Sequence, residues 1–122
     1  MNKLQKNTIT LPWPPRECSP NARVHHMALA KAKVMYKEMC FLMAKEQKLQ
    51  APVGSLVISI DFYPPTKRRH DADNALASCK AGIDGIAQAI GIDDSNFRDY
   101  RLSMKEQVGG YVVVTILGSH GE

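Results

Sequence analysis

Apolar and polar residues alternate in two separate segments of the chain, with the period of a strand that buries one face. In residues 8–13 the apolar side chains share one face and threonines the other, and prolines end the segment because proline cannot donate to a β-ladder. The second segment runs from Ser55 to Tyr63, and its apolar face consists of Leu56, Ile58, Ile60 and Phe62. We expect a strand in each segment.

The last third of the chain contains two more strand-like segments. Residues 97–107 alternate, and residues 111–117 are strongly apolar. Gly109 and Gly110 lie between them, and glycine takes positive φ without steric cost, as tight turns require. The pattern predicts a β-hairpin.

Two helices are predicted between these strands. Met27 to Leu49 has no internal Gly or Pro, and its three- and four-residue apolar spacing predicts one buried side, formed by Met27, Ala30, Val34, Phe41, Leu42 and Leu49. The second helix is capped by Asp73 or Asn74, reaches to about Ile90 and stops at Gly91. Its apolar stripe is Leu76, Cys79, Ile83, Ile86, Ala87 and Ile90.

The expected order is therefore β-α-β-α-β-β. This order favours an α/β (α+β) fold in which two helices pack on a single mixed sheet of about four strands. With 122 residues and no repeats, we expect residues 1–122 to form one domain.

Composition narrows the functional classes only slightly. The net charge of +4 weakly favours an anionic binding partner. The three cysteines, Cys18, Cys40 and Cys79, form no Cys-x-x-Cys pair, which argues against a zinc knuckle and favours reduced, buried thiols. No apolar stretch is long enough to cross a membrane and the first residues do not resemble a signal peptide, so we expect a cytoplasmic protein.

A charged segment before the second helix carries the candidate chemistry. The basic residues are Lys67, Arg68 and Arg69. They are followed by two carboxylates, Asp71 and Asp73, and a further acidic pair, Asp93 and Asp94, follows the helix. Basic side chains neutralise phosphates, and carboxylates approach phosphates when a hard cation such as Mg²⁺ lies between them. This combination favours a metal-dependent nuclease.

A purely structural interpretation stays open at this point. Asp73 can simply cap the helix, Asp71 can pair with Arg69, and the later acidic pair can form a turn. Lys80 lies nearly two turns after Asp73 on the same side of the helix, where a lysine can stabilise charge on a phosphate or simply extend toward solvent.

Three motifs in order resemble the RusA-type Holliday junction resolvases, which are small endonucleases of bacteria and of phages or prophages. The motifs are Ile9-Thr-Leu-Pro-Trp-Pro-Pro15, Asp71-Ala-Asp73-Asn74 before a helix, and Gly91-Ile-Asp-Asp94 after it. The resemblance spans nearly the whole chain and carries the same order of elements.

The resemblance implies a homodimer that binds four-way DNA junctions and cuts two opposed strands with Mg²⁺ or Mn²⁺. The family's metal-binding aspartates would correspond to Asp71, Asp73 and Asp94, with Asp93 as the neighbour that can be confused with Asp94. Its essential lysine would correspond to Lys80, although the usual position, one turn after the second aspartate, is Ala77 here. Lys67, Arg68 and Arg69 would hold the DNA backbone, and the number of metal ions stays open.

Three other functions compete with this one. A nuclease for flaps or forks would use the same residues. A non-catalytic DNA-binding module would need only the basic run and the helix lysines Lys33, Lys37, Lys45 and Lys48. A nucleotide-sugar enzyme that uses Asp-x-Asp with Mn²⁺ fits poorly, because so short a chain leaves little room for a donor-sugar domain.

Overall fold

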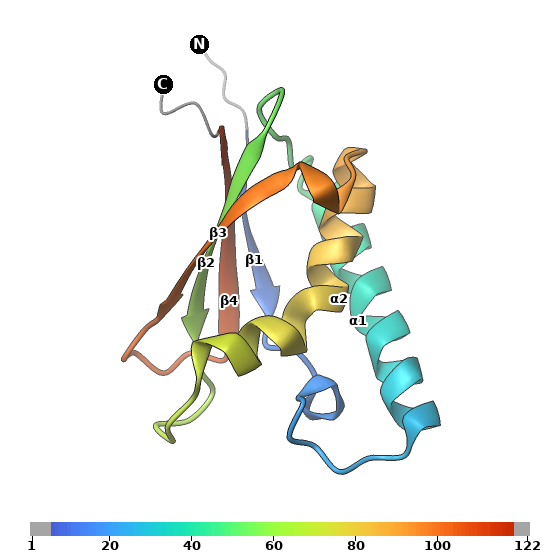
Figure 1. Ribbon diagram of the computed structural model, residues 1–122, viewed down its shortest axis with the longest axis vertical. Helices are drawn as coiled ribbons and strands as arrows, with labels where there is room; N and C mark the ends of the chain where they lie inside the picture. The colour runs from blue at the N-terminus through green and yellow to red at the C-terminus, as the bar shows by residue number, and fades with distance from the viewer. Residues whose placement is uncertain (1–5, 119–122) are drawn as a thin grey trace.

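A computed structural model describes residues 6–118 of the chain, apart from the side chain of Asp94. The elements follow the predicted order, with two short 3₁₀ turns added: β1 Thr8–Pro12, η1 Arg16–Cys18, α1 His26–Glu46, β2 Leu56–Tyr63, α2 Ala72–Ile90, η2 Asp94–Asn96, β3 Phe97–Met104 and β4 Tyr111–Gly118. The predicted α+β fold with a four-stranded mixed sheet and two helices is confirmed (Figure 1).

The sheet has the strand order β1-β4-β2-β3. The β1 and β2 strands each pair antiparallel with β4, and β3 pairs parallel with β2 through the α2 crossover. Both helices lie on the same side of the sheet (Figure 1). The core is formed by the sheet face beneath them, which includes Ile9, Leu11, Ile58, Ile60, Phe62, Val112, Val114 and Ile116.

The predicted hairpin of the last third is wrong, because β2 lies between β3 and β4. The β3 strand alternates apolar residues with exposed charges at Arg98, Asp99 and Arg101, whereas β2 and β4 are largely buried. Charged strands suit a sheet edge and apolar strands suit its centre. Gly110, with φ 80°, instead helps close the 105–110 loop beside β2, where its N–H donates to the Tyr63 carbonyl at 2.7 Å.

The predicted buried side of α1 is also wrong. The helix buries Tyr36, Cys40 and Ala44, while most of the larger apolar residues that were expected inside point outward. The reason is the close approach of α1 to α2 at Gly82 and Gly85. A Cβ on Gly82 would lie 2.6 Å from the Tyr36 ring, and one on Gly85 would overlap the Lys37 carbonyl oxygen. Gly82 thus makes the space that the Tyr36 ring fills, and Gly85 lets the α1 backbone itself approach α2, so the side of α1 with Tyr36, Cys40 and Ala44 is the one that faces α2.

The ends of the helices differ slightly from the prediction. Asp71, and neither Asp73 nor Asn74, occupies the N-cap of α2, which ends at Gly91 in the left-handed conformation as expected. The first helix stops at Glu46, and Leu49 is buried beyond its end.

The cysteines agree with the predicted reduced, buried thiols. Cys18, Cys40 and Cys79 are free and buried, and burial raises the pKa of Cys40 and of Cys79 to about 12. These two thiols are therefore protonated and unreactive at neutral pH. Neither of the two long helices is long and apolar enough to cross a bilayer, within the part of the chain that the structure describes.

Candidate nucleic-acid interface

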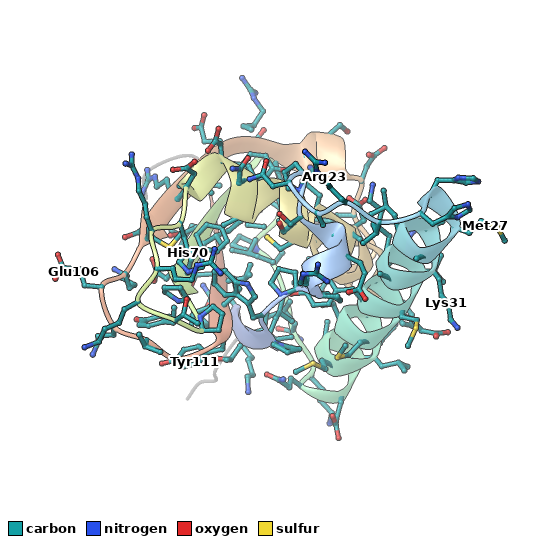
Figure 2. The ribbon with its side chains drawn as sticks, turned by 90° about the horizontal axis from the view of Figure 1, so that it is seen from below. Arg23, Met27, Lys31, His70, Glu106 and Tyr111 are labelled. Carbon is teal, nitrogen blue, oxygen red and sulfur yellow. The ribbon has the colours of Figure 1, made fainter. Side chains whose placement is uncertain are left out.

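A cleft of about 680 Å³ opens where the loop after β1 meets the start of α2. One wall comes from residues 13–23, between β1 and α1. The other comes from residues 65–71 and the first two turns of α2. Arg23 and His70 mark these two walls in the view with side chains (Figure 2).

Trp13 links this cleft to the protein core. Its backbone N–H donates to the Gly110 carbonyl at 3.2 Å, and its ring meets Phe62 and His70 edge-on at centroid distances of 6.1 and 5.7 Å. The β1 strand ends at Pro12, and Pro14 and Pro15, which follow Trp13, line the cleft. The loop that carries the predicted basic run is thus held against the hydrophobic core through His70.

The lining of the cleft is strongly basic. Four arginines contribute to it: Arg16, Arg23, Arg68 and Arg69. Asp71 is the only carboxylate among the lining residues, all of which the structure describes. An arginine presents several donors in a planar fork that matches phosphate oxygens. A concave surface of this kind suits a phosphate backbone.

Arg16 and Arg23 are binding candidates that the sequence reasoning missed. They lie in a polar loop more than 40 residues before the basic run, and neither has a basic neighbour in sequence. Only the fold brings them opposite Arg68 and Arg69. Lys67, by contrast, is exposed and does not line the cleft.

The Asp71 carboxylate lies at the edge of this basic surface. Asp71 has an extended backbone (φ −91°, ψ 135°), and its side chain makes no capping hydrogen bond. The side chain is 56% exposed, and the Arg69 Nε atom lies 3.9 Å away on a side chain that is 94% exposed. Such an exposed ion pair is weak. The carboxylate oxygens therefore stay accessible to a cation, although an N-cap aspartate usually bonds its own helix.

Asp73 follows in the first turn of α2. One of its oxygens accepts the Asn74 backbone N–H at 3.0 Å, and the residue is exposed. It does not line the cleft, although Asn74 does. The positive end of the helix dipole favours a carboxylate at this position.

The second acidic pair lies past the other end of α2. Asp93 forms a local turn in which its carboxylate accepts the Ser95 N–H at 3.1 Å. Asp94 begins η2, and its side chain lies outside the described residues. The 19 residues of α2 would span about 28 Å if straight. That Asp94 binds a metal ion together with Asp71 and Asp73 stays a prediction.

The donor set fits a hard divalent cation with a small number of protein ligands. Among the described side chains, no group of three or more His, Cys, Asp or Glu residues could hold a metal. Mg²⁺ does not need such a cage, because it keeps several waters and is bound by one or two carboxylates together with substrate phosphates. Asp71 supplies carboxylate oxygens at the edge of the basic cleft, and the exposed Asp73 follows two residues later, outside the lining of the cleft.

Lys80 packs against β3 instead of lining the cleft. Its Nζ lies 3.3 Å from the Tyr100 hydroxyl and 5.2 Å from the centre of that ring. The position one turn after Asp73, Ala77, is exposed. The role of Lys80 on the phosphate stays a prediction.

Comparison with known proteins decides the family. No family model matches the chain. An uncharacterised protein of Xylella fastidiosa (strain Temecula1 / ATCC 700964) is 44% identical over 93% of this chain and 78% of its own length. The crossover junction endodeoxyribonuclease RusA of Escherichia coli (strain K12) is 34% identical over 89% of this chain and 92% of its own. This chain belongs to the RusA family.

A phage protein supports the same relationship. The crossover junction endodeoxyribonuclease rusA of Enterobacteria phage 82 is 34% identical over 88% of this chain and 91% of its own length. The resemblance that was based on three short motifs thus extends over nearly the whole RusA chain.

Proposed function

We propose that this RusA family member is a metal-dependent endodeoxyribonuclease that resolves four-way DNA junctions in recombination and repair. The observation that carries the proposal is the arginine-lined cleft, at the edge of which the Asp71 carboxylate is open to a cation. A cleft that only bound phosphate would gain nothing from a carboxylate there, because its charge repels the backbone.

The metal in this proposal is Mg²⁺, with Mn²⁺ as a substitute, held by Asp71 and Asp73. Asp94, which lies past the other end of α2, is the third ligand that the family resemblance implies. When bound, the cation polarises the scissile phosphate and lowers the pKa of a coordinated water. Arg68 and Arg69 hold the backbone of the strand to be cut, and Arg16 and Arg23 hold it from the opposite wall. Lys80 is proposed to stabilise phosphate charge when substrate binding draws it away from Tyr100.

The substrate is tested by comparing four-way, forked and linear duplex DNA of the same sequence in Mg²⁺. The proposal predicts that the four-way junction is cut fastest, with paired nicks in opposed strands. Equal rates on forks and four-way junctions would instead support the broader branched-DNA nuclease. Cutting of plain duplex as fast as junctions would contradict the resolvase proposal.

The opposite wall of the cleft gives a separate prediction for DNA binding. Replacing Arg16 and Arg23 together with glutamine should weaken binding to all DNA sequences equally and reduce the salt dependence, with a slope lower by about 2, because each arginine contacts about one phosphate. Binding is measured by fluorescence anisotropy at several salt concentrations.

The control for this pair is Arg101→Gln, which removes the same charge from an exposed position on β3, outside the cleft. It should change binding much less than the double variant. If Arg101→Gln weakens binding as strongly, the cleft is not the binding surface.

Paired cutting of two opposed strands needs two active sites, whereas one chain provides one cleft. The proposal therefore includes a two-fold symmetric homodimer.

A further inference from the structure

Two tyrosines stack on the face of the sheet that the helices leave uncovered. The rings of Tyr63 and Tyr111 lie with their centroids 4.6 Å apart at an angle of 24°. Their chain neighbours Phe62 and Val112 also pair across β2 and β4, and both are fully buried on the helix side of the sheet. Side chains alternate between the two faces of a strand, so the tyrosines point to the opposite face. Tyr111 is 37% exposed, which leaves part of an aromatic ring open to solvent.

The position of this tyrosine pair beside the arginine-lined cleft points to a ligand, because a cross-strand aromatic pair by itself can simply stabilise a sheet. The Gly110 N–H donates to the Tyr63 carbonyl at 2.7 Å, and the Gly110 carbonyl accepts the Trp13 N–H at 3.2 Å. Trp13 lines the cleft, and so does Pro65, two residues after Tyr63. Backbone hydrogen bonds therefore join the tyrosine pair to the lining of the cleft.

The tyrosine pair is held in place by the loop that precedes β4. The Gly109 N–H donates to the Pro64 carbonyl at 2.8 Å. A Cβ on Gly109 would lie 2.5 Å from the Tyr111 ring and 3.1 Å from the Tyr63 Cβ atom, so the loop closes against the tyrosines because residue 109 has no side chain. A surface that is already ordered loses little conformational entropy when it binds a ligand.

A DNA strand held in the cleft would reach the tyrosine pair within about two nucleotides. Tyr63 and Pro65 are two residues apart, so their Cα atoms are separated by at most about 7 Å. Successive nucleotides of a stacked strand are about 3.4 Å apart. Lys67, exposed on the same loop, adds positive charge outside the cleft. The acidic residue of the neighbouring loop, Glu106, projects outward from the molecule (Figure 2).

We propose that Tyr63 and Tyr111 form a site on which an unpaired base of the bound DNA strand stacks. Every base has a flat π-face, so such a contact selects for an accessible base and tolerates any sequence. In plain duplex a base must first be unstacked and unpaired, which costs free energy that an already unpaired base does not require. The site therefore favours branched or single-stranded DNA over duplex. The inference rests on the proposed function, because it takes the cleft as the place where the DNA backbone binds.

The first test measures binding by fluorescence anisotropy without divalent ions, so that no strand is cut. Tyr111→Leu should weaken binding to a four-way junction at least about 5-fold, the lower end of the loss expected for one base–aromatic stack. It should leave binding to linear duplex unchanged.

Two control variants accompany this test. Tyr111→Phe keeps the ring and removes only the hydroxyl group, and it should bind junctions as tightly as the wild type. Val113→Ala lies two residues further along the same face of β4 and should also bind as the wild type does. Circular dichroism checks that each variant is folded.

A second test removes the base instead of the ring. Four-way junctions are prepared that each lack one base near the branch point, and the wild-type protein should bind at least one of them about 5-fold more weakly than the intact junction. Tyr111→Leu should bind that abasic junction and the intact one equally, because the stack is already lost. A ring that only stabilised the sheet would leave the difference unchanged in the variant. The wild-type measurement stays decisive if Tyr111→Leu does not fold.

Three results would overturn the proposal: wild-type protein that binds every abasic junction as tightly as the intact one, equal weakening of junction and duplex binding by Tyr111→Leu, or an equal loss in Tyr111→Phe. The outcome is separable from that of the proposed function. A protein that cuts junctions without any effect of the missing base would contradict the stacking site alone. A protein whose binding depends on Tyr111 and on one base, but which cuts no DNA, would support the site and contradict the nuclease.

Discussion

Asp73→Asn should reduce the cutting of a four-way junction in Mg²⁺ at least about 100-fold, more than the loss from removing a residue that only orients a metal ligand. Binding of the junction should be unchanged or tighter, because the substitution removes a negative charge that repels phosphate. Cutting is followed on end-labelled strands and binding by gel shift without divalent ions. Calorimetric titration with Mn²⁺ should show weaker metal binding, a result that does not depend on activity.

The control for this variant is Asp61→Asn. Asp61 lies on β2 outside the cleft, where it forms a weak 3.8 Å ion pair with Lys105, and its replacement removes the same charge. It should cut junctions at nearly the wild-type rate. If Asp73→Asn cuts as fast as Asp61→Asn, the protein is better described as a DNA-binding module whose aspartates only support the helix.

Gly85→Ala should lower the free energy of unfolding by about 3 kcal/mol, at the upper end of the usual cost of overpacking a core. The added methyl would overlap the Lys37 carbonyl oxygen and lie 3.1 Å from the Phe41 nitrogen, both of which are backbone atoms of α1. A backbone cannot rotate away as a side chain can, so the two helices must separate. Thermal unfolding should shift down by roughly 10 °C.

Gln88→Ala is the matched control, because it places alanine at an exposed position of the same helix. It should leave the melting temperature within a few degrees of the wild-type value. Gly82→Ala should cost less than Gly85→Ala, since its new methyl meets the side chains of Tyr36 and Cys40. A Gly85→Ala protein as stable as wild type would show that the helices are not in close contact.

The sequence pattern predicted most of the helices and strands, because residues that are close together along the chain determine where each one forms. Ile9 and Leu11 alternate with threonines and are buried as a strand face should be. Gly91 ends α2 in the left-handed conformation that favours glycine. The family resemblance also held over most of the chain, since the RusA proteins of Escherichia coli K12 and of phage 82 match 89% and 88% of it.

Only some of the charged residues that line the cleft could be predicted from the sequence. The basic run and Asp71 are consecutive and were found, but Arg16 and Arg23 face them only after β1 and α2 have packed. Whether Asp94 approaches Asp71 depends on the path of the chain across α2, and no local pattern encodes that path.

By itself the sequence determined the order of strands and helices, the basic and acidic residues beside α2, and the family, because each of these depends on residues close together along the chain or on their linear order. Only the tertiary structure decided which strands are neighbours and which side of α1 is outside. Those outcomes depend on close packing between distant segments. Gly82 and Gly85 of α2 fit the side of α1 that carries Tyr36, Cys40 and Ala44. The apolar β2 lies between β4 and β3, which excludes a β3-β4 hairpin.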